Sequence, residues 1–140
     1  MGPLMTLTPD MVKSEVERYW TAFRGKNAAS LSEFYAQESV GFSTTSKRSE
    51  PGRMVAVRRA REYFETEGTV NARIDSIDVV MLGESAAITS YTFQFFAQRR
   101  TALGKLIDEE VRHGRSTQVF GIDTDGRPRV FHEHFSQAAE

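Results

Sequence analysis

The chain has 140 residues, with 18 Lys and Arg against 19 Asp and Glu, and a formal net charge of −1. This length suits a single domain with a substantial core, and the balanced charge argues against a nucleic-acid-binding protein. There is no cysteine, which excludes disulfides, thiol nucleophiles and cysteine-ligated zinc, and favours a cytoplasmic protein. No apolar run approaches the ~20 residues of a membrane span, so no membrane partner is expected.

The first half of the sequence predicts three helices. Thr8 can cap a helix with a proline in its first turn, and apolar residues follow at helical spacing until Gly25. Asn27 can cap a short second helix, and Pro51 opens a third helix that runs to about Glu67.

Strand-like alternation replaces the helical period after the third helix. Extended segments are predicted over residues 38–47, 70–82, 86–98, 110–123 and 127–136. Short turns between the last four segments indicate antiparallel pairing, and Asp125-Gly126 is a strong hairpin signal. Helices followed by consecutive strands predict an α+β fold, with three N-terminal helices packed on a strongly curved, mainly antiparallel sheet. Such a sheet leaves room for a ligand pocket at its open end.

Three stretches carry a family resemblance: "VERYWTAF", "RRAREYF" and "DTDGRPRVFHEHFS". They resemble the first helix, the third helix and the terminal hairpin of the NTF2-like superfamily, in its SnoaL-like branch. The resemblance covers about Thr8 to Ser136, and extends to ketosteroid isomerase-like proteins and to the association domain of calmodulin-dependent kinase II. It implies a cystatin-like cone over residues 8–137, after a flexible N-terminus at 1–7. It also implies an internal pocket, and a homodimer that packs through the outer face of the sheet.

The ketosteroid isomerase mechanism is incomplete in this sequence. Tyr19 matches the position of the family's catalytic tyrosine. The general base would lie near Phe42, where there is no carboxylate, and the second acid would lie near Gln118, which is an amide. We therefore expect no ketosteroid isomerase of the usual mechanism, and no cofactor.

Two of the three histidines lie in the segment "VFHEHFS". Alternation along a strand places His132 and His134 on one side, together with Val130. A catalytic zinc site needs a third protein ligand, and the remaining histidine, His113, lies near the start of another predicted strand. We expect no metal, and we expect both histidines to face outward across a dimer interface. Proton transfer by either histidine within the pocket is the alternative.

The same alternation turns Glu133 toward the core, together with Phe131 and Phe135. A carboxylate among apolar side chains has a raised pKa, which suits general acid–base catalysis. The alternative is a structural role, with Glu133 paired to Arg112, Arg115 or Tyr19.

An aromatic wall with a few polar groups is typical of a pocket for a flat apolar ligand. The candidate ligand-binding residues are Tyr19, Trp20, Phe23, Tyr35, Tyr63, Thr92, Gln118, Glu133 and Phe135. The candidate catalytic residues are Glu133, Tyr19, His132 and His134. Tyr91, Phe93 and Phe95 alternate to the side opposite Thr92, which indicates that both sheet faces are covered.

These observations predict a homodimeric SnoaL-like protein whose pocket binds a small apolar molecule. A cofactor-free isomerase, cyclase or dehydratase that uses Glu133 or a histidine is one alternative. An oligomerisation or interaction module is the other.

Overall fold

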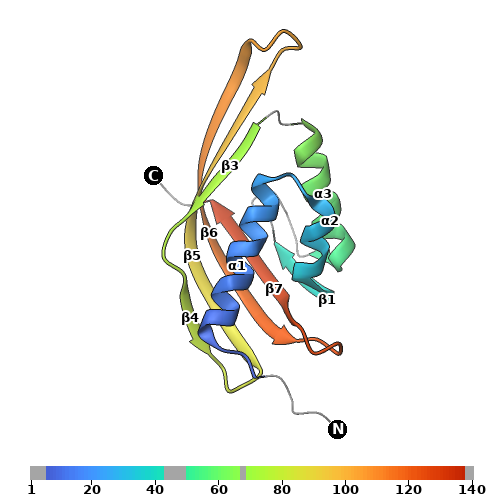
Figure 1. Cartoon of the computed structure of the whole chain (residues 1–140), viewed down its shortest axis with the longest axis vertical. Helices are drawn as coiled ribbons and strands as arrows, with labels where there is room; N and C mark the ends of the chain where they lie inside the picture. The colour runs from blue at the N-terminus through green and yellow to red at the C-terminus, as the bar shows by residue number, and fades with distance from the viewer. Residues whose placement is uncertain (1–5, 43–49, 67–68, 138–140) are drawn as a thin grey trace.

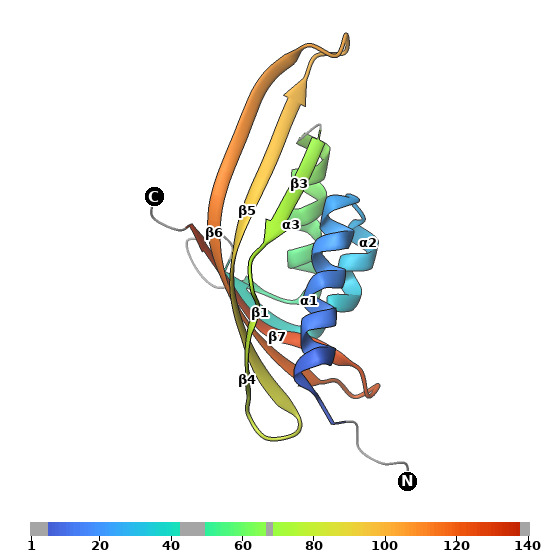
Figure 2. The ribbon, with the colours of Figure 1, turned by 60° about the vertical axis from the view of Figure 1, so that its left-hand side comes forward.

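The computed structural model describes residues 6–42, 50–66 and 69–137 of the chain. Its helices are α1 (Pro9–Arg24), α2 (Ala28–Leu31) and α3 (Arg53–Thr66), and the 3-10 helix η1 (Ser32–Phe34) follows α2. The helices cover one face of a curved sheet, and the hairpin of β5 and β6 extends past them (Figure 1, Figure 2). None of the helices in these residues is long and apolar enough to cross a membrane.

The helix ends follow local capping rules. The Thr8 side chain accepts a hydrogen bond from the Met11 N–H at 3.2 Å, and the Asn27 side chain accepts one from the Ser30 N–H at 3.1 Å. α1 ends before Gly25, as predicted. The third helix begins at Arg53 rather than Pro51, because Pro51 is paired in a strand.

The strands form one mixed sheet. They are β1 (Tyr35–Phe42), β2 (Glu50–Pro51), β3 (Thr69–Ile74), β4 (Asp78–Met81), β5 (Ala86–Arg100), β6 (Leu106–Ile122) and β7 (Pro128–Gln137). Within the described residues the order is β2-β1-β7-β6-β5-β3, and β4 pairs with β5 beside β3. β1 runs parallel to β7, whereas β5, β6 and β7 form an antiparallel meander. The α+β prediction with a mainly antiparallel sheet is confirmed.

Three predicted boundaries change. The segment predicted as one strand over 70–82 is two strands, β3 and β4, which pair with different parts of β5. Leu7, which was predicted as part of a flexible terminus, is buried, and its N–H donates to the Glu84 carbonyl at 2.8 Å. The predicted strand at 38–47 begins earlier, at Tyr35, and its residues 43–47 lie outside the described part of the chain.

The inner face of β5 is the reverse of the one predicted. Tyr91, Phe93 and Phe95 are buried under the helices, whereas Thr92 is exposed on the outer face and Phe96 is half-buried there. The placement of Tyr91, Phe93 and Phe95 on the face opposite the pocket is therefore wrong. The aromatic residues of β5 belong to the core, together with residues of α1.

A β-bulge at Phe131 changes which residues of β7 face the core. Phe120 pairs with Val130 and Val119 pairs with His132, so the register shifts between the two pairs. As a result Val130 is fully buried, although alternation had placed it with the histidines. Phe131 lies on the outer face, where its ring covers Gly121. The predicted inward orientation holds for Glu133 but is wrong for Phe131.

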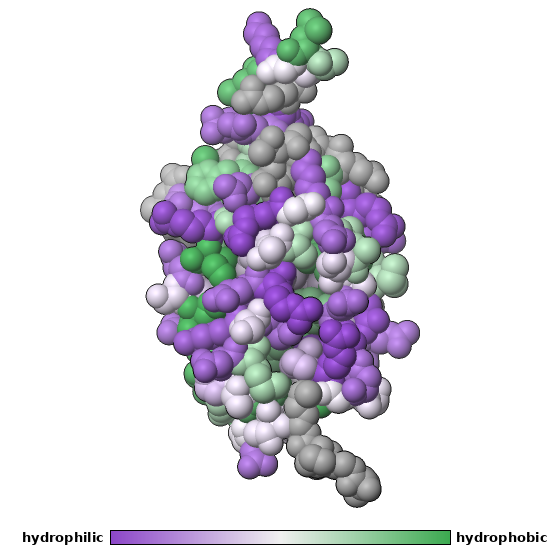
Figure 3. Space-filling view, viewed as in Figure 1, coloured by the Kyte–Doolittle hydropathy of each residue, from purple (hydrophilic) through white to green (hydrophobic). Residues whose placement is uncertain are grey.

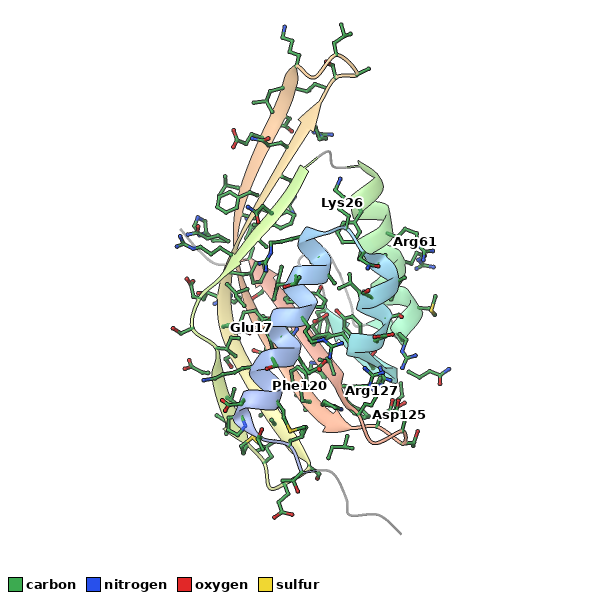
Figure 4. All side chains as sticks on the ribbon, viewed as in Figure 1. Glu17, Lys26, Arg61, Phe120, Asp125 and Arg127 are labelled. Carbon is green, nitrogen blue, oxygen red and sulfur yellow. The ribbon has the colours of Figure 1, made fainter. Side chains whose placement is uncertain are left out.

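The turn between β6 and β7 is held against η1 by Arg129. Its guanidinium is 3.1 Å from the Asp123 carboxylate and 2.7 Å from the Asp125 carboxylate, and it donates to the Glu33 carbonyl. Figure 4 shows Asp125 and Arg127 at this turn, below α2. The contact fixes the end of β7 that precedes Glu133.

The surface over the helices is mainly hydrophilic, whereas the projecting end of the β5–β6 hairpin carries hydrophobic residues (Figure 3). Leu103 at this end is 96% exposed, and Ile107 is 64% exposed. The buried core therefore lies between the helices and the lower part of the sheet.

Candidate functional site

The centre of the candidate site is the carboxylate of Glu133, which points from β7 into the core and is only 9% exposed. Tyr35 of β1 donates its hydroxyl proton to Oε2 at 2.7 Å, and Gln118 of β6 donates from Nε2 to Oε1 at 2.8 Å. These strands flank β7 on its two sides. A Cβ added at Gly41 would lie 2.6 Å from the Glu133 carbonyl oxygen, so glycine permits the close approach of β1.

Burial raises the pKa of Glu133 from its ordinary value of 4.5 to about 7, although the hydrogen bonds from Gln118 and Tyr35 act to lower it. The desolvation of the charged form outweighs both donors. A carboxyl group of this kind gains and loses a proton near neutral pH, which is the property that a general acid or base needs.

A second layer of hydrogen bonds orients Gln118. Its Oε1 accepts from the Tyr91 hydroxyl at 3.1 Å and from the Thr89 hydroxyl at 3.3 Å. The Tyr91 hydroxyl in turn accepts from Nε1 of Trp20 at 2.9 Å. A continuous chain of buried polar groups thus runs from α1 through β5 and β6 to the carboxylate on β7.

Aromatic rings surround this chain. Ring centroids are 5.1 Å apart for Tyr19 and Trp20, 4.9 Å for Trp20 and Phe93, and 5.6 Å for Phe93 and Phe135. Such contacts exclude water from polar groups that would otherwise be hydrated. Burial and then the nearby Glu133 charge raise the pKa of Tyr19 well above its ordinary value. Tyr19 is therefore close to the carboxylate and neutral at physiological pH.

Ser116 contributes a buried hydroxyl that the rest of the site does not satisfy. Its Oγ lacks a hydrogen-bond partner of good geometry among the described residues, although it lies close enough to Tyr91 to lower the pKa of that group. The side chain is 3% exposed and faces the core from the position paired with Tyr91 and Phe135. A buried polar atom without a partner calls for a specific explanation, such as a bound water or ligand atom.

The structure brings most of the predicted residues together around one carboxylate. Those in contact with Glu133 or with its aromatic surroundings are Tyr19, Trp20, Phe23, Tyr35, Gln118 and Phe135. The side chain of Tyr63, which was also predicted to line the pocket, lies outside the described residues. The structural alternative paired Glu133 with a buried Arg or Tyr, for instance Arg112, Arg115 or Tyr19. Glu133 does accept a hydrogen bond from a buried tyrosine, but this residue is Tyr35, and the second donor is Gln118.

Three predicted residues lie on the opposite face of the sheet from the carboxylate. Thr92 is exposed there and donates to the carboxylate of Asp75. His132 and His134 flank Glu133 on the outer side of β7, where Phe42 packs at 6.4 Å and 5.3 Å from their rings. Their position separates the histidines from the buried site.

Sequence reasoning missed Thr89, Tyr91 and Ser116 as site residues. The sequence did not show which face of β5 is buried. Thr89 and Tyr91 share a face with Phe93, and all three are buried. Ser116 lies two residues from Gln118 on β6, so the alternation of side chains places both on the same buried face. Among the described residues there is no group of three His, Asp or Glu side chains that could hold a metal ion.

Comparisons with solved structures identify the fold. An NTF2-like superfamily protein from Salmonella enterica matches with a TM-score of 0.79 and 18% identity, covering 94% of this chain and 91% of that chain. A putative dehydratase of the NTF2-like family from Streptomyces avermitilis matches with a TM-score of 0.81 and 14% identity, over 95% and 100% of the two chains. The association domain of the C. elegans kinase CaMKII matches with a TM-score of 0.67 and 20% identity, covering 91% of each chain.

Sequence comparison agrees with the fold. No curated protein sequence gives a match. The model of the SnoaL-like domain matches residues 12–140, which is nearly the whole chain. The chain therefore belongs to the SnoaL-like domain family and has the NTF2-like, or cystatin-like, fold.

Proposed function

We propose that the chain binds a small, largely apolar molecule beside Glu133, and that Glu133 exchanges a proton with it as a cofactor-free general base and acid. The observation that carries the proposal is a carboxyl group with a pKa of about 7 inside an aromatic shell. Aromatic side chains suit a flat apolar ligand, and the single titrating carboxyl supplies the proton transfer.

The proton transfer requires no further reagent. The ionised carboxylate takes a proton from an acidic C–H bond of the ligand, and the electron pair of that bond moves onto an adjacent carbonyl oxygen. The protonated carboxyl then returns the proton to a carbon of the ligand in an isomerisation, to the new alkoxide oxygen in a cyclisation, or to the departing hydroxyl group, which leaves as water, in a dehydration. Isomerisation, cyclisation and dehydration each begin with such a step, which is why these reaction classes are the ones proposed.

The unpartnered hydroxyl of Ser116 supports the presence of a ligand atom in the same region. It lies on the same face of β6 as Gln118, two residues away, and is paired with Tyr91 on β5 and with Phe135 on β7. A carbonyl oxygen of the ligand would satisfy it.

The test uses 2-tetralone, an apolar bicyclic ketone with acidic C–H bonds, as the probe. In deuterated water we expect the protein to accelerate deuterium uptake at the carbon between the carbonyl and the ring. The rate should increase with pH through about 7 and then level off, because the ionised carboxylate is the base.

The matched variant is Glu133→Gln, which keeps the size and polarity of the side chain. It should lose the acceleration while 2-tetralone still quenches the fluorescence of Trp20. Equal exchange rates for both proteins would exclude Glu133 as the base. If wild-type protein shows neither quenching nor acceleration at millimolar 2-tetralone, binding of this ligand class is excluded.

A homodimer through the outer sheet face is a second proposal. Val80, Ile88 and Val119 form one row across β4, β5 and β6 on this face, and the ring of Phe131 lies beside the row. Val80 is 58% exposed on β4, which pairs only with β5 in the described part of the chain, so the row presents an apolar side chain to solvent at the edge of the sheet. The similarity to an association domain supports self-association. Sedimentation at micromolar concentration tests it: a dimer is expected, and a monomer would refute it.

The cytoplasmic location stays a prediction.

A further inference from the structure

The hydrogen-bond chain between Trp20 and Glu133 has a defined direction. An indole Nε1–H can only donate, so the Tyr91 hydroxyl must be the acceptor in the 2.9 Å bond with Trp20. The single hydroxyl proton of Tyr91 then points to Oε1 of Gln118, 3.1 Å away. The Thr89 hydroxyl lies 3.3 Å from the same oxygen. The Thr89 hydroxyl also lies 3.5 Å from the Gln118 backbone carbonyl, so Tyr91 is the donor whose proton is directed to the carbonyl end of the Gln118 amide.

This arrangement determines which end of the amide faces Glu133. With its oxygen toward Tyr91, Gln118 presents its NH2 group to Oε1 of Glu133 at 2.8 Å. An amide NH2 group donates and cannot accept a hydrogen bond. A proton on Oε1 would therefore face another donor, at the cost of a buried hydrogen bond.

The other carboxylate oxygen has a different neighbour. Oε2 lies 2.7 Å from the hydroxyl of Tyr35, which can donate to an ionised oxygen and, after rotation of its proton, accept from a protonated one. The rings of Tyr35 and Tyr19 are 6.3 Å apart, so a second hydroxyl-bearing side chain lies next to it. Oε2 is thus the oxygen that can hold a proton without losing its hydrogen bond.

We propose that Trp20, acting through Tyr91 and Gln118, is a positioning residue that confines the exchangeable proton of Glu133 to Oε2. In the proposed function, on which this consequence rests, Oε2 is the oxygen that receives the proton of the ligand. The ligand must then present its acidic C–H bond to Oε2, next to Tyr35, rather than to Oε1, next to Gln118.

The titratable groups that face Glu133 are Tyr19 from α1, Tyr35 from β1 and Tyr91 from β5. Burial raises the pKa of each tyrosine above its ordinary value, so all three stay neutral while Glu133 titrates. Changes in the titration of Glu133 near pH 7 therefore report on its hydrogen bonds.

The test is a 13C NMR titration of the Glu133 carboxyl, without ligand, in the Trp20→Phe variant. Loss of the indole donor frees Tyr91, and Gln118 can then turn its oxygen to accept a proton from Oε1. The ionised carboxylate still requires the NH2 group of Gln118, whereas the protonated carboxyl can now use either orientation of the amide. We therefore expect the pKa of Glu133 to rise by roughly 0.3, which corresponds to a twofold gain in protonated arrangements. Tyr91→Phe interrupts the same chain with a smaller change in volume, and should give a rise if Trp20→Phe does not fold.

The matched control is Thr89→Val, which removes the other donor to Gln118 but leaves Trp20 and Tyr91 in place. Its Glu133 should titrate as in the wild-type protein. An unchanged or lowered pKa in both Trp20→Phe and Tyr91→Phe, or an equal rise in Thr89→Val, would overturn the inference. Because these titrations contain no ligand, a failure of 2-tetralone to bind or exchange would refute the proposed function without altering their result.

Discussion

Tyr35 and Glu133 are 98 residues apart in the sequence, and the Tyr35 hydroxyl donates to Oε2 of the carboxylate at 2.7 Å in the core. The contact exists because β1 runs parallel to β7 and lies beside it. It joins the N-terminal helical half of the chain to the last strand, at the carboxyl group whose pKa burial raises to about 7.

Removal of this donor should change the titration of Glu133. In Tyr35→Phe the ionised carboxylate loses a hydrogen bond, so the pKa of Glu133 should rise above 7 by about 1. NMR titration of the carboxyl measures this. The control is Thr92→Val on the outer sheet face, which should leave the titration unchanged; an equal change in both variants would show that the Tyr35 contact is not the cause.

The stability of the protein should fall as the pH rises from about 4.5 to about 7. The folded state holds the proton of Glu133 up to a pKa of about 7, whereas the unfolded chain releases it near 4.5. The folded state therefore binds more protons in this window, and its stability contribution is complete below 4.5 and lost above 7. We expect a loss of about 3 kcal/mol for one carboxyl. Urea unfolding at several pH values measures this loss.

Glu133→Gln should remove this pH dependence, since the amide does not titrate. Its unfolding free energy should be nearly constant across the window, apart from the smaller contributions of surface carboxylates. A wild-type protein whose stability is constant or increases over the same window would contradict the raised pKa.

Gly114 should be intolerant of a side chain because Phe93 lies flat across it. A Cβ at this position would be 2.1 Å from the ring, which is far inside van der Waals contact. Gly114→Ala should displace the ring of Phe93 from the aromatic shell and destabilise the fold by about 1–3 kcal/mol. Urea unfolding tests this against Gly25→Ala, whose Cβ would meet no atom closer than 3.5 Å. Equal stabilities for the two variants would refute the packing argument.

The outer-face dimer predicts that a charge at Val80 weakens self-association. Val80→Lys places an ammonium group in the apolar row of β4, β5 and β6, and the dimer dissociation constant should increase by about tenfold or more. Met54→Lys is the control, because Met54 is 64% exposed on α3, on the helical side of the molecule. Sedimentation of both variants measures the effect, and the same dissociation constant for the two would place the interface elsewhere.

The order of the elements was predictable from local sequence patterns. The cap at Thr8, the helix end at Gly25 and the hairpin turn at Asp125-Gly126 depend on neighbouring residues only, and each is found where it was predicted. The inward orientation of Glu133 was also correct, because Glu133 lies after the bulge, where the pairing of β7 with β6 is regular and side chains alternate.

The side chains of the longer strands that face the core were not predictable in the same way. Both faces of β5 carry apolar residues, so alternation alone does not say which set is buried; the packing of Trp20 against Tyr91 and Phe93 decides it. The bulge at Phe131 depends on the register with β6 and on the space above Gly121. The partners of Glu133 come from β1 and β6, and such pairings follow from the order of the sheet rather than from local sequence.

The 13C NMR titration of the Glu133 carboxyl in the wild-type protein, assigned by comparison with Glu133→Gln, tests the central claim most directly. A buried acid–base group predicts a pKa of about 7. A pKa at the ordinary value of 4.5 would contradict the account, since the carboxylate would then be ionised and inert as an acid at neutral pH.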